Sequence, residues 1–240
     1  MLTFSFGIIT DGTQDARLLQ CVNSIENQNI PESNHEIIIV GNTRIGELKP
    51  NIQIIPFDES QRYGWITRKK NIIAKEAKFE NLVLMHDYYV LTGGWYDGWL
   101  KFGNEFDIAT NIIATMEGKR HSDWVACAYD IWDLFPVWKD NYDVGLPYEV
   151  TNLSRFMYIS GGYMVIKKHI ALQFPQLEQF GHNESEDVHW GRNVRQFCEF
   201  KLNRNASCTL TKPGKWAVNS IQEDLLEFLQ RLNTWIETYN

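Results

Sequence analysis

Short apolar runs alternate with longer segments of helical periodicity along the first hundred residues. The apolar runs are 4–10, 36–40, 52–56 and 82–85. Between them, Leu18, Val22 and Ile25 recur at helical spacing, and 66–78 repeats this pattern with lysines on the other face. Buried strands that alternate with amphipathic helices are typical of βαβ units. The pattern predicts one Rossmann-like α/β domain with a central, mostly parallel sheet flanked by helices.

The pattern changes beyond Gly93. The predicted elements are a helix over 95–106, a strand over 107–115, a strand pair or bent strand over 156–166, a helix over 187–197, and a C-terminal helix over 222–239 that packs on the body. Between 124 and 148 the chain is dense in aromatic residues, proline and aspartate, without clean periodicity. Such a segment is more typical of long functional loops than of core.

Composition and charge narrow the class of protein. With 240 residues, 44% hydrophobic and 22% charged, the chain suits one globular domain. A net charge of -7 argues against nucleic acid as a partner, because that binding needs clustered positive charge. The four cysteines show no CxxC spacing, and no apolar stretch reaches the length of a membrane span. The segment at the first strand has neither the positive region nor the small-residue cleavage site of a secretion signal. We therefore expect a soluble, cytoplasmic protein with reduced thiols and no transmembrane segment.

Polar residues follow the predicted strands where a ligand of an open α/β sheet binds, outside the carboxyl ends. These residues are Thr10, Asp11, Asn42 and Asp87. A carboxylate at Asp87 can hold Mg²⁺ or Mn²⁺ while a diphosphate fills the remaining ligand positions. Asp87 can equally cap the next turn, and its position alone does not choose between these interpretations.

A second candidate is the acidic run that contains Glu184, Glu186, Asp187 and His189. Three carboxylates within four residues repel one another unless they cap a helix, meet cations or act as a base. Glu186 and Asp187 also suit a helix N-terminus, so the catalytic and the structural interpretation are equally supported here. His189 is close enough in the chain to face the same cleft, where histidine accepts Mn²⁺.

Weaker candidates lie on the helix before Asp87 and in a glycine pair. Lys70 can offset phosphate charge and Asn71 can hydrogen-bond a ribose, although residues on such a helix are commonly just solvated. Gly161 and Gly162 permit close approach to a ligand or mark a bulge. In the aromatic segment, Trp132 and Trp138 are candidates for stacking on an acceptor sugar, although most tryptophans are core residues.

Taken together, residues 3–198 resemble the family 2 glycosyltransferases with the GT-A fold. The resemblance rests on Phe-Gly-Ile-Ile-Thr in the first strand, on Arg-Lys-Lys-Asn and the strand that ends in Leu-Met-His-Asp, on Tyr158 to Lys167, and on Glu186 to Arg192. It implies that Thr10 and Asn42 lie near the nucleotide base, that Asp87 binds the metal and diphosphate, and that Asp187 is the catalytic base. The family's paired-acid motif is reduced here to His86, Asp87 and Tyr88, and His189 stands where the family often has another acid.

The resemblance implies an inverting glycosyltransferase of the hexosyltransferase type, assisted by Mn²⁺ or Mg²⁺. Its partners would be a nucleoside-diphosphate sugar and a saccharide or other hydroxyl acceptor. Asp187 would be the base, Glu186 would orient the acceptor, and Lys70 would stabilise the leaving diphosphate. One domain over 1–240 would comprise a nucleotide-binding half (1–115), an acceptor and catalytic half (116–218) and the C-terminal helix (219–240).

Two alternatives remain open. One is a catalytically inactive protein that keeps the GT-A fold and binds nucleotide or sugar. The other is a nucleotidyltransferase, although that class usually has a basic, glycine-rich loop after the first strand, and residues 10–14 lack basic character.

Overall fold

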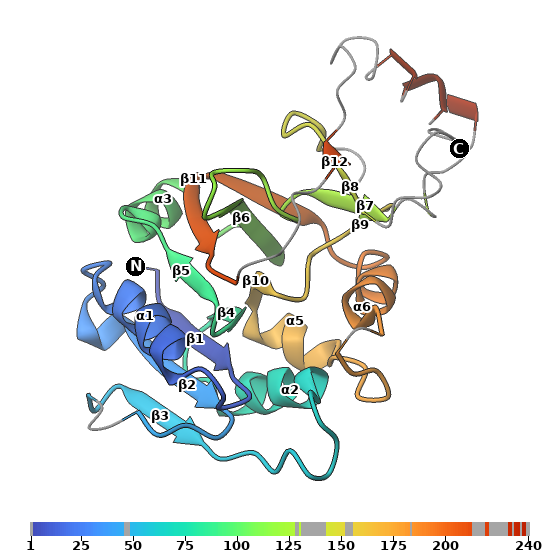
Figure 1. The fold of residues 1–240 in the computed structure, drawn as a ribbon. Helices are drawn as coiled ribbons and strands as arrows, with labels where there is room; N and C mark the ends of the chain where they lie inside the picture. Colours follow the sequence, from blue (N-terminus) through green and yellow to red (C-terminus); the bar gives the residue numbers. More distant parts are fainter. Residues whose placement is uncertain are drawn as a thin grey trace.

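The computed structural model describes residues 2–45, 49–127, 130, 143–151, 156–182, 184–212, 219–220, 230–231, 233–235 and 237–238. Its centre is an eight-stranded sheet in the order β3-β2-β1-β4-β10-β6-β11-β5 (Figure 1). The strands in this order are β3 (Ile52–Ile55), β2 (His35–Val40), β1 (Phe4–Ile9), β4 (Asn81–His86), β10 (Tyr163–Lys167), β6 (Ile108–Thr115), β11 (Phe200–Leu210) and β5 (Tyr89–Leu91). The mixed α/β architecture and the four strands expected in the first hundred residues are confirmed.

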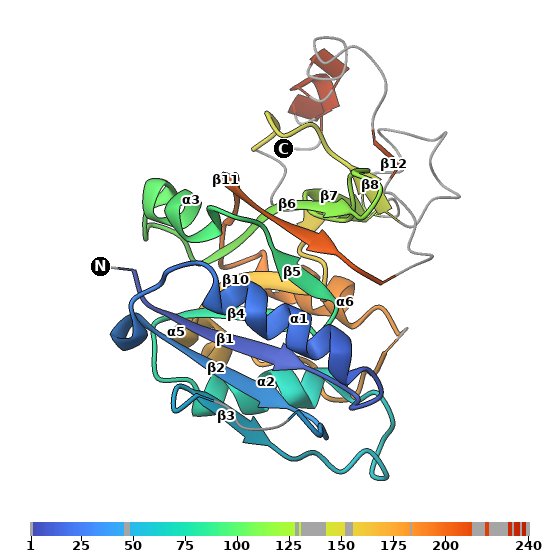
Figure 2. The same cartoon turned by 60° about the vertical axis from the view of Figure 1, so that its left-hand side comes forward.

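The first half of the sheet is parallel: β1 pairs with β2 and β4, and β2 pairs with β3. Alternate side chains of β2 enter two different hydrophobic clusters, Ile38 in one and Ile37 in the other. Since successive side chains of a strand point to opposite faces, these clusters lie on the two faces of the sheet. Helix α1 (Asp15–Glu26) contributes to one cluster and α2 (Ile66–Glu76) to the other, which gives a three-layer sandwich (Figure 2).

The second half of the sheet is mixed. Strand β10 runs antiparallel to both β4 and β6, β11 is parallel to β6, and β5 is antiparallel to β11 at the sheet edge. The sequence pattern did not predict β11, the longest described strand at 11 residues. A register shift between Asn203 and Ser207 is the reason, because a bulge changes the phase of the buried positions within the strand.

A smaller sheet in the order β12-β8-β7-β9 lies beside the main one (Figure 1). Its strands are β12 (Asn219–Ser220), β8 (Asp143–Gly145), β7 (Val125–Cys127) and β9 (Met157–Tyr158). The strand pair expected over 156–166 thus consists of β9 and β10, which belong to different sheets. The segment 219–240, expected as a C-terminal helix, begins with the short strand β12. Its described residues between 230 and 238 are helical. The ring centroids of Trp235 and Phe156 lie 4.6 Å apart.

The remaining helices are η1 (Glu32–Asn34), α3 (Trp95–Phe102), α5 (Lys168–Gln173) and α6 (Glu186–Val194). Helix α3 ends earlier than the expected 106, because Gly103 takes φ +90°, a left-handed backbone conformation that stops a helix. The four cysteines are buried, and none of them forms a disulfide bond. Within the described ranges, no helix has the length and apolar character needed to span a membrane.

Candidate functional site

Three strand ends meet at one edge of the sheet. Because β1, β2 and β4 are parallel and in register, the residues that follow Ile9, Val40 and His86 lie side by side. The Thr10 hydroxyl donates a 2.7 Å hydrogen bond to Asp87 Oδ2 across this edge. The structure therefore brings Thr10 and Asp87 together as the sequence predicted for neighbouring strand ends.

The residue that follows β2 is Gly41, and a side chain there would collide with Thr10, which follows β1. Gly41 has φ +145°, and a Cβ at this position would lie 2.1 Å from the Thr10 carbonyl oxygen. Asn42, the next residue, has an exposed side chain, and its backbone carbonyl packs against Gly12. Asn42 is thus near the first strand end, but it does not line the pocket described below.

The glycine pair reaches the same edge from the opposite direction. Strand β10 is antiparallel to β4, so its first residues lie beside the last residues of β4, and the His86 amide donates to the Gly162 carbonyl at 3.1 Å. The Gly161 amide donates to Asp187 Oδ2 at 2.8 Å. A Cβ at Gly161 would lie 2.5 Å from Glu186 Oε1. The close approach expected of these glycines is therefore an approach to the acidic pair of α6.

The two acids of that pair have different surroundings. Glu186 is buried, and its Oε1 lies 3.6 Å from the ammonium of Lys70, which is also buried. Burial raises the pKa of Glu186; Lys70 opposes this rise, and the negative charge of Asp187 adds to it. Asp187 is partly exposed, and its Oδ1 accepts the Val188 amide at 2.9 Å. Asp187 is therefore the member of the pair that a substrate can reach.

A pocket of about 140 Å³ opens at the sheet edge. Its polar lining consists of Thr10, Asp11, Arg17, Tyr63, Lys69, His86, Asp87, Tyr88, His182 and Lys212. Burial raises the pKa of Asp87, although the Thr10 hydroxyl and Arg17 oppose it. Burial also raises the pKa of Asp11, but the two hydrogen bonds from Thr13 and the charges of Lys69 and Arg17 outweigh burial, so the net pKa is lowered. The pocket thus combines two acids of unlike character with several basic groups.

Three of these basic groups, Arg17, His182 and Lys212, were not predicted from the sequence. A fourth, Lys69, belongs to the predicted Arg-Lys-Lys-Asn run, in which Lys70 was the chosen candidate. Lys69 is buried and donates to the Thr10 carbonyl at 2.8 Å while it also pairs with Glu59. Lys212 follows β11, and the Thr211 amide donates to the Tyr88 carbonyl at 2.8 Å. Since β11 was not predicted, nothing in the sequence indicated that Lys212 returns to the strand end at Asp87.

The loop before α6 is fastened to the start of α2. Arg62 donates to the carbonyls of Glu178 and Gln179 at 3.0 and 2.9 Å, and Thr67 donates to the Phe180 carbonyl at 2.8 Å. These bonds hold the chain just before Glu186. The acidic pair is therefore positioned by residues 62–71 as well as by Gly161.

Asn71 also bonds to the loop before α6, and it lines a pocket other than the one that contains Asp87. Its side-chain amide donates at 2.9 Å to the Gln176 carbonyl and to Glu178, and its oxygen accepts the Gln176 amide at 2.8 Å. His189 lies parallel to Phe180 with ring centroids 4.4 Å apart. The structure does not bring Asn71 or His189 into the pocket that contains Asp87. Trp132 and Trp138 lie outside the described residues.

The donors needed for a divalent metal do not assemble around Asp87. Its Oδ2 accepts the Thr10 hydroxyl, and its Oδ1 lies 3.9 Å from the Arg17 guanidinium. Mg²⁺ and Mn²⁺ prefer several oxygen or imidazole ligands. In the part of the chain that the structure describes, no group of three or more His, Cys, Asp or Glu side chains could hold a metal ion. Among the described residues, the metal implied by the family resemblance would therefore have one carboxylate ligand, and both oxygens of that carboxylate already face other groups, which is a poor fit.

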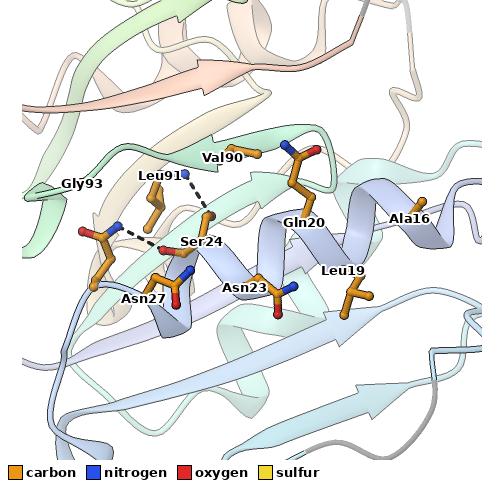
Figure 3. A pocket seen from close by; sticks show the side chains of 10 residues that line it. Ala16, Leu19, Gln20, Asn23, Ser24, Asn27, Val90, Leu91 and Gly93 are labelled. Atoms are coloured by element: carbon orange, nitrogen blue, oxygen red, sulfur yellow. Dashed lines mark hydrogen bonds between the residues drawn. The ribbon is translucent and has the colours of Figure 1, made fainter.

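A larger depression of about 490 Å³ lies between α1 and β5 (Figure 3). Ser24 and Gln28 fix α1 here: the Ser24 hydroxyl accepts the Leu91 amide at 3.0 Å, and the Gln28 amide donates to the Ser24 carbonyl at 3.0 Å. Its lining has carboxamides and apolar groups but no titratable side chain. It therefore offers no acid, base or cation to a ligand.

This sheet, with acids and basic groups gathered at one edge, is the GT-A fold of glycosyltransferases. The chain is similar to a structure of TarS from S. aureus (residues 1–349), with a TM-score of 0.55 and 11% identity over 91% of this chain and 60% of that one. It is also similar to GalNAc-T7 crystallised with UDP, GalNAc and Mn²⁺, with a TM-score of 0.62 and 13% identity over 100% of this chain and 50% of that one. No family model and no curated protein sequence matches the chain.

Proposed function

We propose that the protein is a glycosyltransferase that moves a sugar from a nucleoside-diphosphate donor to an acceptor hydroxyl. The observation that carries this proposal is the hydrogen bond from the Gly161 amide to Asp187. It holds a partly exposed carboxylate at the same sheet edge as Asp87 and the basic pocket. A base on one side and a cationic pocket on the other match the needs of a reaction that deprotonates a hydroxyl and releases a diphosphate.

In this mechanism Asp187 accepts the proton of the acceptor hydroxyl as its oxygen bonds to the anomeric carbon. The bond from that carbon to the diphosphate oxygen breaks with its electron pair, so a single displacement inverts the anomeric centre. Glu186 and Lys70 form a buried ion pair beside Asp187. We therefore assign them the support of this part of α6, in place of the acceptor and diphosphate contacts expected from the sequence. Gly161 fixes the Asp187 carboxylate through its amide.

The donor binds at the pocket by Asp87, as the family resemblance implies. GalNAc-T7 was crystallised with UDP and Mn²⁺, which supports a nucleotide diphosphate as the ligand class. Mn²⁺ or Mg²⁺, if bound here, would have Asp87 as its protein ligand and would neutralise the diphosphate. Because the described donor set does not fit a metal, no step of the mechanism depends on one.

The acceptor is a saccharide or another hydroxyl compound that binds beside Asp187. Trp132 and Trp138 remain the proposed acceptor-stacking residues. The four cysteines are buried and form no disulfide bond, which is consistent with the reducing cytoplasm as the location of the protein.

The test is a screen of UDP- and GDP-sugars for release of nucleoside diphosphate by the purified chain. Asp187→Asn should lower the rate by about 10²- to 10⁴-fold, the usual contribution of a general base, while donor affinity changes little. Glu199→Gln is the matched control, because this acid is 62% exposed and pairs only loosely with Lys201 at 3.9 Å. Nucleotide binding without turnover of any donor would support the inactive binding protein instead.

A further inference from the structure

Two cations of the pocket, Arg17 and Lys212, lie against one aromatic ring. The Arg17 guanidinium carbon is 5.9 Å from the centre of the Tyr88 ring, and the Lys212 ammonium is 5.3 Å from the same centre. Both residues line the pocket that contains Asp87. Both cations therefore contribute positive charge to the same pocket.

Lys69 is less suited to bind a ligand than these two cations. It is 1% exposed, it donates to the Thr10 carbonyl, and it forms an ion pair with Glu59. A lysine with two protein partners and almost no exposure has little to offer a ligand. Arg17, whose side chain is 26% exposed, is more accessible to a ligand than Lys69.

Arg17 also lacks hydrogen-bond acceptors. Its Nε is buried and has no hydrogen-bond partner among the described residues, and its nearest carboxylate, Asp87 Oδ1, is 3.9 Å from Nη2. A buried donor without an acceptor costs about 1–3 kcal/mol. A guanidinium presents its N–H groups in a planar fork that matches the oxygens of a phosphate. The missing acceptors are therefore those that a phosphate group supplies.

Asp87 is placed to orient this arginine. One carboxylate oxygen is taken by the Thr10 hydroxyl and the other faces Arg17. A divalent metal at Asp87 would meet the guanidinium at close range, and like charges there repel. The donor set and the charge around Asp87 thus agree in opposing a metal at this position.

We propose that Arg17 and Lys212 bind the diphosphate of the nucleotide donor directly, in place of a bridging divalent metal. This inference rests on the proposed function. Arg17 binds one phosphate through its fork, Lys212 neutralises the other, and Asp87 is a positioning residue for Arg17. Both cations also stabilise the negative charge that grows on the diphosphate as the sugar leaves.

The test is calorimetric titration of the full chain with UDP, GDP and inorganic pyrophosphate, in EDTA and in Mn²⁺. We expect binding in EDTA, with affinities within about threefold of those in Mn²⁺. Arg17→Gln and Lys212→Gln should each weaken binding by about 10- to 100-fold, the worth of a charge-assisted hydrogen bond. Lys101→Gln, a change at an exposed lysine of α3, should leave the affinity unchanged.

Arg17→Lys separates loss of function from loss of fold, because it keeps the charge but loses the fork; it should bind pyrophosphate with intermediate affinity. The inference is overturned if binding needs Mn²⁺, or if Arg17→Gln behaves like Lys101→Gln. Those results leave the proposed function intact. If the ligands bind in EDTA through these cations and no sugar donor is turned over, the proposed function fails and the inference stands. If none of the ligands binds with or without Mn²⁺, both fail.

Discussion

The Thr10 hydroxyl and the Asp87 carboxylate, 77 residues apart in the chain, share a buried hydrogen bond of 2.7 Å. It joins the carboxyl ends of β1 and β4 and leaves the second Asp87 oxygen facing Arg17. The same hydroxyl accepts the Gly12 amide at 3.1 Å, so it also shapes the loop after β1. One side chain therefore orients the acid of the pocket and the backbone beside it.

Replacement of Thr10 by valine keeps the shape of the side chain and removes this hydrogen bond. The buried Asp87 oxygen then lacks its donor, and we expect the free energy of unfolding to fall by about 1–3 kcal/mol. Urea unfolding followed by circular dichroism measures the change. Thr10→Ser restores a hydroxyl and should recover most of the loss. A destabilised serine variant beside a fully stable valine variant would show that the methyl group near Gly41, and not the hydrogen bond, stabilises the fold.

Gly161 is the contact between the glycine pair and the acids of α6. Gly161→Ala would place a Cβ 2.5 Å from Glu186 Oε1 and 3.1 Å from Asp187 Cβ, so the Glu186 carboxylate and Asp187 must both shift. A shift of about 1 Å in a catalytic group can lower a rate by about 10²-fold, and we expect a loss of that size in sugar transfer. The measurement is kcat with the best donor of the screen, together with its dissociation constant.

Gly93→Ala is the matched control for this change, because a Cβ at Gly93 meets nothing within 4 Å. It should retain the rate of the unmodified protein. If Gly161→Ala is as active as Gly93→Ala, the position of Asp187 does not limit transfer, and its role as base loses its support.

Asp87 should make the stability of the protein depend on pH in a defined direction. Burial raises the pKa of Asp87 in the folded state, so the fold favours the protonated acid. Its stabilising contribution is complete below the ordinary pKa of aspartate, about 4, and is lost as the pH rises through the raised folded value. Asp87→Asn cannot ionise, so its stability relative to the unmodified protein should increase as the pH rises from about 4 and then level off.

The measurement is the melting temperature of Asp87→Asn minus that of the unmodified protein, at several pH values from about 4 upward. Glu186, whose pKa burial also raises, is present in both, so its contribution cancels in the difference. A difference that is independent of pH, or that falls as the pH rises, would contradict the raised pKa of Asp87.

The sequence predicts the parallel half of the fold because its strands are uniformly buried. β1, β2 and β4 are each six buried residues, and such runs are visible without a partner. β11 changes phase at its bulge, so its pattern matches no regular strand, and Lys212 was missed with it. Thr10 and Asp87 were both predicted to follow strands, and they are neighbours because β1 and β4 pair in parallel.

Helical candidates were harder to place, since consecutive residues of a helix point about 100° apart. On α2, Lys69 reaches the Thr10 carbonyl, Lys70 reaches Glu186, and Asn71 reaches the Gln176 carbonyl. Three adjacent residues thus contact three different parts of the structure, and their spacing in the sequence does not reveal which one faces the pocket. His189 is a similar case on α6. It points toward Phe180 in the preceding loop, and its position in the sequence does not reveal this direction.

Asp123 should be a strong determinant of stability in the half of the molecule opposite the parallel strands. Its side chain is fully buried and accepts hydrogen bonds from the amides of Ile113 and Trp124, from the Arg120 guanidinium and from the Tyr148 hydroxyl, at 3.2, 2.6, 2.7 and 2.7 Å. These bonds tie the end of β6 to the start of β7. Removal of one partner from a buried charge pair costs about 3–5 kcal/mol, which we expect for Asp123→Ala in urea unfolding.

The Tyr148 hydroxyl tests whether that loss comes from the hydrogen-bond network. Tyr148→Phe removes one bond and should cost about 1 kcal/mol, because Asp123 keeps its other three donors. If the network carries the energy, Tyr148→Phe should cost much less in the Asp123→Ala background, which gives a coupling of about 0.5–3 kcal/mol in a double-mutant cycle. Glu117→Ala, at an exposed turn between the same strands, should leave stability within about 0.5 kcal/mol. Additive losses for Asp123 and Tyr148 would mean that the two side chains act independently, and that the cavity left by Asp123 accounts for the destabilisation.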